Sequence, residues 1–355
     1  MGSEMCIRDR KLTSNILQVL NGNTLVTPPI WMMRQAGRHL PEYLAIRKTT
    51  KNFIEFCLTP TKAAEVTLQP VDRYDMDAAI LFADILLIPI ILGTDVSFQK
   101  GVGPILSPIS TKQISKFTKD FNLDKISSVF ETVSLVRKSL DKNKALIGFC
   151  GGPWTVATYM IEGQGSPKKE IAKRFAYENP QVMDDLLEAL VITSADYLIG
   201  QAKAGADVLK IFESWAEGLT PELFEKLVIR PTKKIISLVR QAGVQKPIIG
   251  FPRGAGLNTF DYAKQTGVTA LALGTDIHMA KIRAQIPKDM PYQGNLDPLA
   301  LRIGGNVLKQ AVQNVLDSAT GPHIFNLGHG VMPDVKIENV HAVIDHIRTG
   351  EGAYV

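Results

Sequence analysis

The stretch ALIGFCGGPWT, residues 145–155, decides the fold. It opens with an uninterrupted apolar run, Ala145–Phe149, and passes through Cys150 into two glycines followed by Pro153. An apolar run without polar alternation is typical of a strand buried on both faces, as in a parallel sheet. Proline fits the first turn of a helix. The stretch therefore predicts a strand, a tight turn and a helix in succession.

The same pattern recurs along the chain, since seven further apolar runs end in glycine or a polar residue. Eight strands alternating with helices predict an α/β fold, a single (β/α)8 TIM barrel. An open doubly wound sheet is the alternative, but no G-x-G-x-x-G sequence follows a first strand. The further runs are Ile30–Met33, Ala78–Phe82, Asp207–Phe212, Pro247–Phe251, Thr269–Leu273, Pro291–Gln293 and His323–Phe325.

The segments between these runs predict the helices. Thr59 before Pro60 is typical of a helix start, and Gly205 and Gly243 of helix ends. Residues 94–123 predict a long excursion after the second strand. The expected helices are Thr61–Val71, Asp124–Leu140, Pro180–Ala204, Glu222–Gln241, Gly305–Ala319 and Pro333–Thr349.

Composition is that of an ordinary globular protein. Of the 355 residues, 45% are hydrophobic and 21% are charged. The net charge of +5 is mild, and no Lys/Arg block indicates nucleic-acid binding. The longest apolar run, Ala78–Gly93, is interrupted by Asp84 and Pro89 and is too short to span a bilayer. We therefore expect neither a nucleic-acid partner nor a membrane span.

The cysteines indicate a reducing compartment, which predicts a cytoplasmic protein. Cys6, Cys57 and Cys150 form an odd, sparse set without C-x-x-C or H-x-C spacing. This spacing predicts neither a disulfide framework nor a thiolate metal site. Cys150 fits a small core residue better than a nucleophile.

The first ten residues, MGSEMCIRDR, fit nothing downstream. They resemble a translated sequencing adapter, so we expect residues 1–10 to be a non-native or disordered leader. No low-complexity linker divides the rest of the chain. Residues 11–355 are accordingly expected to form one catalytic barrel domain.

In a (β/α)8 barrel the active site lies at the carboxyl ends of the strands. At the first such end, Arg34 and Arg38 flank Gly37. A guanidinium grips carboxylate or phosphate in a two-pronged manner, which predicts a site for anionic groups. A pair of surface salt bridges is the alternative interpretation.

The second strand end carries Asp84 within an otherwise apolar sequence. An ionised carboxylate buried alone is costly, so Asp84 must be paired, protonated or exposed at the strand's mouth to receive a ligand. The functional interpretation is a carboxylate that accepts donors from a substrate or stabilises its positive charge. A rim aspartate that caps a loop is the structural alternative.

Three further side chains lie at or just after strand ends. Tyr159 follows the Gly151-Gly152 turn and could aim its hydroxyl at the mouth, although a core tyrosine is equally compatible. Ser214 lacks a G-x-S-x-G elbow, so it is expected to be a hydrogen-bond donor rather than a nucleophile. His329 lies between two glycines and is expected to be accessible. No H-E-x-x-H, Walker loop or Cys/His cluster indicates metal or nucleotide chemistry.

Five motifs together resemble the uroporphyrinogen decarboxylase family, from Leu12 to the C-terminus. They are RQAGR with LPEY (34–38, 40–43), LFADIL (81–86), GPWT with TYM (152–155, 158–160), FESWA (212–216) and NLGHG (326–330).

The resemblance implies a (β/α)8 barrel that is usually a homodimer and needs no metal or organic cofactor. It implies removal of CO2 from the four acetate groups of uroporphyrinogen III, giving coproporphyrinogen III in haem and chlorophyll biosynthesis. Catalytic roles would fall to Asp84, Arg34, Tyr159 and His329. The substrate-binding residues it implies are Arg34, Gln35, Ala36, Gly37, Arg38, Arg47, Asp84, Tyr159, Ser214 and His329.

The implied chemistry suits these residues. Asp84 would face the pyrrole N–H groups, since a carboxylate offers about four lone-pair sites. It would stabilise the cation formed when a pyrrole carbon is protonated, an effect of roughly 3–4 kcal/mol or more. Arg34, Tyr159 and His329 are all candidates for the proton donor, and arginine is a poor acid.

Three departures and two alternatives accompany the resemblance. The family usually has Asp at Glu213, Gly at Glu217 and Tyr at His39. Glu217 would add negative charge near an anion site, with an effect on either the loop or affinity. A corrinoid-linked methyltransferase of the same superfamily would need His and Cys zinc ligands that the sequence does not place together. A non-catalytic porphyrinogen-binding barrel is the other alternative.

Overall fold

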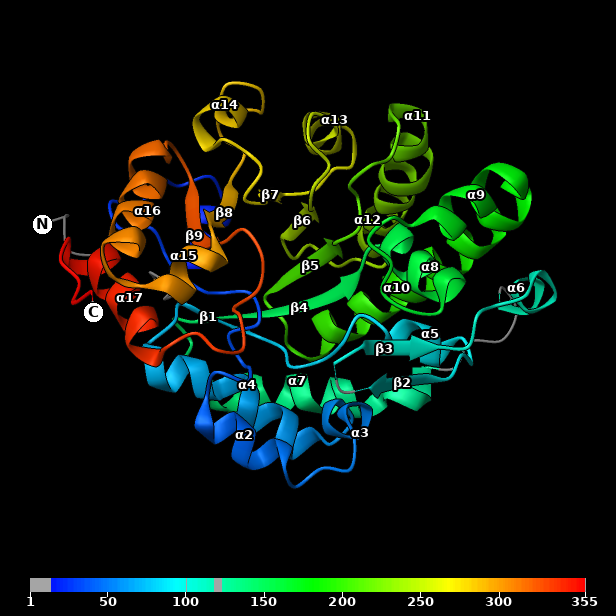
Figure 1. The fold of residues 1–355 in the computed structure, drawn as a ribbon, viewed down its shortest axis with the longest axis horizontal. Helices are drawn as coiled ribbons and strands as arrows, with labels where there is room; N and C mark the ends of the chain where they lie inside the picture. The colour runs from blue at the N-terminus through cyan, green and yellow to red at the C-terminus, as the bar shows by residue number, and fades with distance from the viewer. Residues whose placement is uncertain (1–13, 100, 118–122, 355) are drawn as a thin grey trace, which may run out of the picture.

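Seven parallel strands form one curled sheet in the order β1-β4-β5-β6-β7-β8-β9 (Figure 1). The computed structural model describes residues 14–99, 101–117 and 123–354, so the expectation for residues 1–10 lies outside it. The strands are β1 (Ala78–Ile80), β4 (Ala145–Gly151), β5 (Val208–Glu213), β6 (Ile248–Pro252), β7 (Ala270–Ala272), β8 (Tyr292–Leu296) and β9 (His323–Leu327).

The eighth position of the ring is filled by a single bridge rather than a strand. Ile30 pairs in parallel with Phe325 of β9, and the Phe325 amide donates to the Pro29 carbonyl at 2.9 Å. On the other side, the Asp77 amide donates to the Ile30 carbonyl at 2.8 Å, just before β1. The segment therefore lies between β9 and β1 and links the two edges of the sheet.

The prediction of a full strand over Ile30–Met33 is thus wrong in extent. Pro28 and Pro29 have no amide hydrogen to donate, which prevents the pairing from extending backwards. Beyond Trp31 the chain turns, because the Met32 amide donates to the Gln35 side chain at 3.0 Å. The first predicted strand is reduced to the residues between these two limits.

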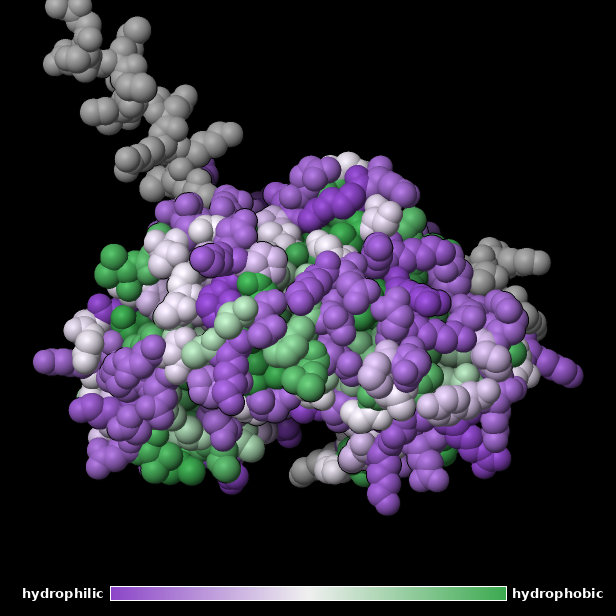
Figure 2. Space-filling view, turned by 90° about the horizontal axis from the view of Figure 1, so that it is seen from above, coloured by the Kyte–Doolittle hydropathy of each residue, from purple (hydrophilic) through white to green (hydrophobic). Residues whose placement is uncertain are grey.

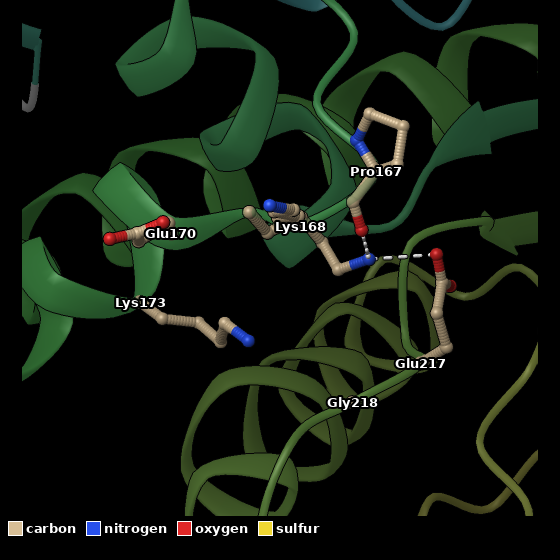
Figure 3. Close-up of a pocket in the computed structure, with 7 residues that line it drawn as sticks. Pro167, Lys168, Glu170, Lys173, Glu217 and Gly218 are labelled. Carbon is tan, nitrogen blue, oxygen red and sulfur yellow. Dashed lines mark hydrogen bonds and ion pairs between the residues drawn. The ribbon is translucent and has the colours of Figure 1, made fainter.

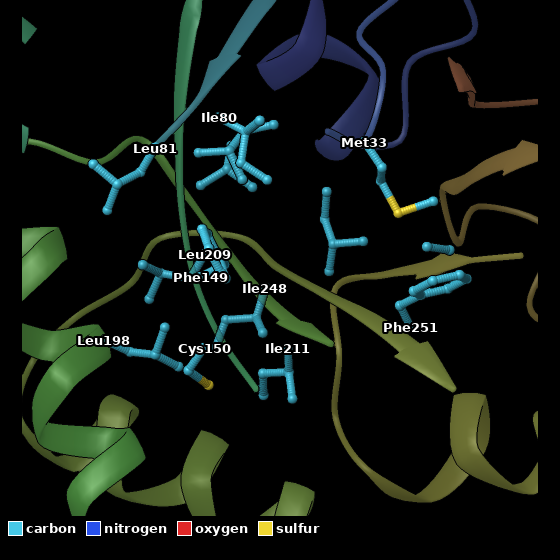
Figure 4. Packing of buried hydrophobic residues seen from close by; sticks show 14 of the residues in the cluster. Met33, Ile80, Leu81, Phe149, Cys150, Leu198, Leu209, Ile211, Ile248 and Phe251 are labelled. Carbon is cyan, nitrogen blue, oxygen red and sulfur yellow. The ribbon is translucent and has the colours of Figure 1, made fainter. Parts of the chain in front are cut away.

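The other seven predicted strands are confirmed, and their burial explains their sequences. All seven residues of β4 are buried, and β5 pairs with it from Ile147 opposite Val208. Sheet residues such as Phe149, Leu209 and Ile248 pack together in the apolar core (Figure 4). Cys150 belongs to the same core, and burial raises the pKa of its thiol, as expected for a packing residue.

The long helices lie outside the sheet (Figure 1). The longest, α10 (Pro180–Ala204), has the predicted bounds. The helices α4 (Pro60–Tyr74), α7 (Ser127–Ser139), α16 (Gly305–Ser318) and α17 (Ile337–Thr349) are close to expectation.

The predicted helix Glu222–Gln241 is divided by a widened turn. It consists of α11 (Pro221–Phe224), a π-helical segment (Glu225–Ile229) and α12 (Arg230–Gln241). Pro231 lacks the amide that would continue the α-helical bonding at this point, which accounts for the local change of register.

The excursion after β1 forms structure of its own. The strands β2 (Val96–Gln99) and β3 (Gly103–Leu106) make an antiparallel hairpin, which α5 (Leu87–Ile91) precedes and α6 (Thr111–Phe117) follows. The Leu106 amide donates to the Gly163 carbonyl at 2.7 Å, so the hairpin is bonded to the end of α8. The remaining helices are α1 (Asn15–Leu20), α2 (Pro41–Arg47), α3 (Phe53–Cys57), η1 (Leu123–Ile126), α8 (Pro153–Glu162), α9 (Glu170–Glu178), α13 (Asn258–Gln265), α14 (Met279–Arg283) and α15 (Pro298–Ile303).

The surface in Figure 2 is mostly hydrophilic, with apolar side chains showing in several separate places. Within the described part of the chain, every helix is too short or too polar to cross a bilayer.

Candidate active site

The loop after Trp31 presents the two predicted arginines at the sheet's rim. Arg34 has a left-handed backbone, with φ of 60°, and both Arg34 and Arg38 are exposed. Gln35 is buried, and its amide nitrogen donates to the Ala78 carbonyl of β1 at 3.0 Å. The Gln35 side chain is thus occupied in fixing the loop to the sheet, so its contact with a ligand would come through the backbone.

The Arg34 side chain lies against Gly330, which follows β9 at the opposite edge of the sheet from β1. A Cβ placed on Gly330 would stand 2.4 Å from Cδ of Arg34, so a larger residue there would displace this side chain from its position. A Cβ on Gly328 would come within 2.5 Å of the Thr275 amide nitrogen. The glycines flanking His329 therefore lie in close contact with Arg34 and Thr275, and His329 is less accessible than the sequence predicted.

His329 itself is half-buried at the end of β9. The pKa of its imidazole is lowered to about 4, mainly by burial and to a smaller extent by the positive charges of Arg34 and Arg253. The ring is consequently neutral at physiological pH in the ligand-free site. The electrostatic influence of both arginines shows that they lie near it.

Asp84 follows β1 and is half-buried, with Arg34 close enough for its charge to act on the carboxyl. Its Oδ1 accepts a hydrogen bond from the Leu86 amide at 2.8 Å. Burial raises the pKa of this carboxyl to about 6, against the opposing effects of the Leu86 amide and of Arg34. One oxygen of Asp84 thus caps the loop, as the structural alternative predicts, while its role toward a substrate stays a prediction.

Tyr159 projects from α8 into the same neighbourhood. It is half-buried, and its ring meets the Trp215 ring edge-on with centroids 5.5 Å apart. Burial is the main cause of its raised pKa, and the charges of Asp84, Arg34 and Arg253 also act on it. The structure thus brings Tyr159, Asp84 and Arg34 together, as the sequence predicted.

Arg253 is the site residue that the sequence reasoning missed. It directly follows β6, and its Nε donates to the Ser214 carbonyl at 2.9 Å. Ser214 is half-buried at the end of β5, where it was expected. The available signal was positional, because Arg253 follows an apolar run in the same way as the other predicted site residues.

Arg47 is partly used by its own helix end. Its Nη1 donates to the Thr50 hydroxyl at 2.8 Å and to the Thr50 carbonyl at 3.3 Å. It is half-buried, and its charge acts on Tyr43 and Cys57, which are buried beneath it. Arg47 is therefore partly occupied by Thr50, and its Nε and Nη2 make no hydrogen bond among the described residues, so they can bind a ligand.

The departures at Glu213 and Glu217 have distinct structural roles. Glu213 is fully buried, and its Oε1 accepts bonds from the Thr155 amide at 2.7 Å and from the Thr155 hydroxyl. Burial raises the pKa of Glu213 to about 8. Glu217 accepts a bond from Lys169 Nζ at 2.7 Å, so its charge is compensated by a residue of the loop before α9.

The third departure, His39, belongs to the packing of the arginine loop. It is half-buried and its ring stacks on Tyr74 of α4, with centroids 6.3 Å apart. Burial lowers the pKa of His39 to about 4. It is therefore a neutral packing group in this position.

A pocket of about 410 Å³ lies between the start of α9 with the loop before it and the loop after β5 (Figure 3). It contains none of the predicted site residues, and Glu217 stands on its wall. Among the described residues, no group of three or more His, Cys, Asp and Glu side chains is placed to hold a metal ion.

The family model for uroporphyrinogen decarboxylase (URO-D) matches residues 11–350. The chain belongs to the uroporphyrinogen decarboxylase family. Curated relatives of that name include a Maricaulis maris protein, 51% identical over 94% of this chain and 97% of its own length. A Caulobacter vibrioides relative is 51% identical over 96% of this chain and 97% of its own length.

Solved structures bear out the architecture of the family. A methyltransferase from Methanosarcina mazei superposes with a TM-score of 0.76 over 95% of this chain and 98% of its own, at 17% identity. A B12-independent methionine synthase from Shewanella sp. W3-18-1 gives 0.52 at 10% identity, over 82% of this chain and 86% of its own. At such identities the likeness concerns the fold alone, and it confirms the predicted barrel class.

Proposed function

We propose that this chain is a carboxy-lyase that decarboxylates uroporphyrinogen III to coproporphyrinogen III in haem biosynthesis. The observation that carries the proposal is Asp84, a half-buried carboxyl at a strand end on which the charge of Arg34 acts. The charges of Arg34 and Arg253 both act on the neighbouring His329. One negative group among several positive ones suits a ligand with an N–H-rich centre and a carboxylate rim.

The rim of the substrate would be bound by the arginine loop. Arg34 and Arg38 are exposed and offer forked donors to carboxylates. The amides of Ala36 and Gly37 have no hydrogen-bond acceptor among the described residues, so they can donate to the same groups. Ser214 and His329 lie at neighbouring strand ends and would complete the binding surface.

The centre of the substrate would meet Asp84. Protonation of a pyrrole carbon beside an acetate group gives a cation, and the electron pair of the C–CO2 bond then flows into the ring. CO2 departs and leaves an exocyclic methylene, a second proton converts this methylene into a methyl group, and loss of the first proton from the ring carbon restores the pyrrole, so that one proton is consumed for each CO2 released. Asp84 must be ionised to stabilise the cation, and its fixed position avoids reorganisation at that moment.

Three groups stand near enough to be considered as the proton donor. Arg34 is a poor acid, and burial raises the pKa of Tyr159, which weakens it as an acid too. Burial lowers the pKa of His329 to about 4 in the free site, and the charges of Arg34 and Arg253 contribute to this lowering. Substrate carboxylates bound to those arginines would offset only the arginines' share of this lowering, so Arg34, Tyr159 and His329 all stay candidates for the donor.

The same proposal extends to the state of the enzyme. We expect a single barrel domain that works as a cytoplasmic homodimer and requires neither metal nor organic cofactor, as the family resemblance implies. The side chains named above supply binding, charge stabilisation and proton transfer between them. Light scattering of the purified protein tests the dimer, and activity after chelation tests metal independence.

Turnover with uroporphyrinogen III tests the function. The protein is incubated anaerobically with this substrate, with and without chelator, and the products are resolved by carboxyl number. Intermediates with seven, six and five carboxyl groups should appear and end at four. A substrate that keeps all its carboxyl groups, under conditions where the protein is folded, would refute the proposal.

A further inference from the structure

We propose that Arg253 is a further carboxylate-binding guanidinium of this site, beside those expected from the sequence, and that Glu217 and Lys169 are its positioning residues. The inference rests on the proposed function, because it assumes a substrate with several carboxylates. It assigns a role to the arginine that the sequence did not indicate and to the unexpected acidic residue beside it.

Arg253 is fixed between two strand ends. Its backbone amide donates to the Glu213 carbonyl at 3.0 Å, and its Nε donates to the Ser214 carbonyl at 2.9 Å. Its charge acts on both His329 and Tyr159, which places the guanidinium near both groups. The side chain is 31% exposed, so its end can reach a ligand.

The terminal nitrogens of Arg253 keep their hydrogens available. Nη2 stands 3.7 Å from Glu217 Oε1, which is an ion pair but too long for a hydrogen bond. A two-pronged contact with a carboxylate needs such terminal donors. Arg253 is therefore held in place through Nε, while its terminal nitrogens stay available to bind a ligand.

Lys169 explains why Glu217 does not close onto Arg253. Its side chain is only 2% exposed, and its Nζ donates to Glu217 Oε1 at 2.7 Å and to the Pro167 carbonyl at 3.0 Å (Figure 3). The ammonium also lies 5.0 Å from the Trp215 ring centroid. A lysine buried to this degree needs a counter-ion, and Glu217 provides it.

The backbone on both sides is shaped for this arrangement. Gly254 has φ of 73°, and a Cβ there would approach Cβ of Glu217 to 2.8 Å. Lys169 adopts φ of 50°, uncommon for a residue with a side chain. Because Lys169 compensates Glu217, the positive charge of Arg253 remains available toward the barrel mouth.

Steady-state kinetics with uroporphyrinogen III test the role of Arg253. Arg253→Met should raise KM about tenfold with kcat changed less than about threefold, as expected when one charged hydrogen-bonding contact is lost. Arg253→Lys should fall between, since it keeps the charge but not the fork. The matched control is Arg230→Met, which removes an arginine that is 69% exposed and paired with Glu225 on the outer helices.

The KM values of Lys169 and Glu217 variants test the positioning role of these two residues. Lys169→Met should free Glu217 to pair with Arg253 and raise KM, and adding Glu217→Gln should restore part of the loss. A merely structural role for Lys169 predicts that the double variant is no better than the single one. Equal KM values for Arg253→Met and Arg230→Met would overturn the inference.

Failure of the proposed function would be visible separately. If the wild-type chain does not decarboxylate uroporphyrinogen, binding of the oxidised octacarboxylic porphyrin is measured by fluorescence quenching instead. The inference then predicts about tenfold weaker binding to Arg253→Met than to the wild type. Equal binding would overturn it whatever the outcome for turnover.

Discussion

Asp84 carries a charge that its surroundings disfavour. Burial raises the pKa of its carboxyl from 3.8 to about 6, although the Leu86 amide and Arg34 both favour the ionised form. The residue is thus held ready for a donor-rich partner that the free protein does not supply. Such a group sacrifices stability for function.

The cost of ionising Asp84 should be measurable as a pH-dependent loss of stability. The folded-state pKa lies above the unfolded one, so ionisation of Asp84 destabilises the fold as pH rises from about 4 to 6. Asp84→Asn removes this cost and keeps an acceptor for the Leu86 amide. The variant should be more stable at pH 8 by up to about 3 kcal/mol and equal to the wild type near pH 4. Urea unfolding at both pH values measures this, and a difference independent of pH would contradict it.

Gly330 gives a second prediction at the residue scale. Gly330→Ala would place a methyl group 2.4 Å from Cδ of Arg34 and push that side chain from its position. Because Arg34 is exposed, the fold should tolerate the shift while KM rises about fivefold, corresponding to about 1 kcal/mol. Kinetics beside a thermal melt separate the two effects. A lowered melting temperature with unchanged KM would show that Arg34 is not displaced from a binding position.

At the scale of elements, the strand pattern was predictable because burial on both faces leaves continuous apolar runs. The bounds of α10 followed from Pro180 and Gly205 in the same way. The widened turn before Arg230 was not predictable, since its apolar periodicity resembles that of an ordinary helix. The length of the first strand was overestimated, because Trp31–Met33 are buried like strand residues although only Ile30 forms a bridge.

Glu213 joins two elements, since it accepts the Thr155 amide of α8 from the end of β5. Burial raises its pKa from 4.5 to about 8, so protonation is favoured in the fold and stability is lost as pH rises through this interval. Glu213→Gln should therefore gain stability over the wild type between pH 5 and 8. Glu213→Ala should lose about 1–3 kcal/mol by leaving the Thr155 amide unpaired. Chemical unfolding measures the free energy of unfolding of the wild type and of both variants. A Glu213→Gln protein as unstable as Glu213→Ala would contradict the role of Glu213 as the acceptor for the Thr155 amide.

At the scale of the whole molecule, the site depends on bringing distant segments into one ring. Strand-end position was enough to select Asp84, Ser214 and His329 from the sequence. It was not enough for the Lys169–Glu217 pair, whose partners are 48 residues apart and belong to two different loops. Nor did it reveal that Arg47 donates to Thr50, because local side-chain bonding is invisible in strand spacing.

Closure of the ring gives a prediction at this scale. The Asp77 side chain accepts a bond from the Ile30 amide at 2.8 Å, which holds the closing segment to β1. Asp77→Ala should cost about 1–2 kcal/mol of unfolding free energy, whereas Asp77→Asn keeps the acceptor and should cost less. Urea unfolding of both variants checks the order. Equal losses would mean that the charge of Asp77, rather than this bond, matters.

The most direct test of the account is the turnover of Asp84→Asn with uroporphyrinogen III under anaerobic conditions. The account predicts a loss of about 100-fold or more in kcat, corresponding to about 3 kcal/mol or more, because the cation loses its fixed counter-charge. The variant should remain folded, with the stability gain described above. Near-normal kcat in a folded Asp84→Asn protein would contradict the account and reduce Asp84 to the loop-capping residue.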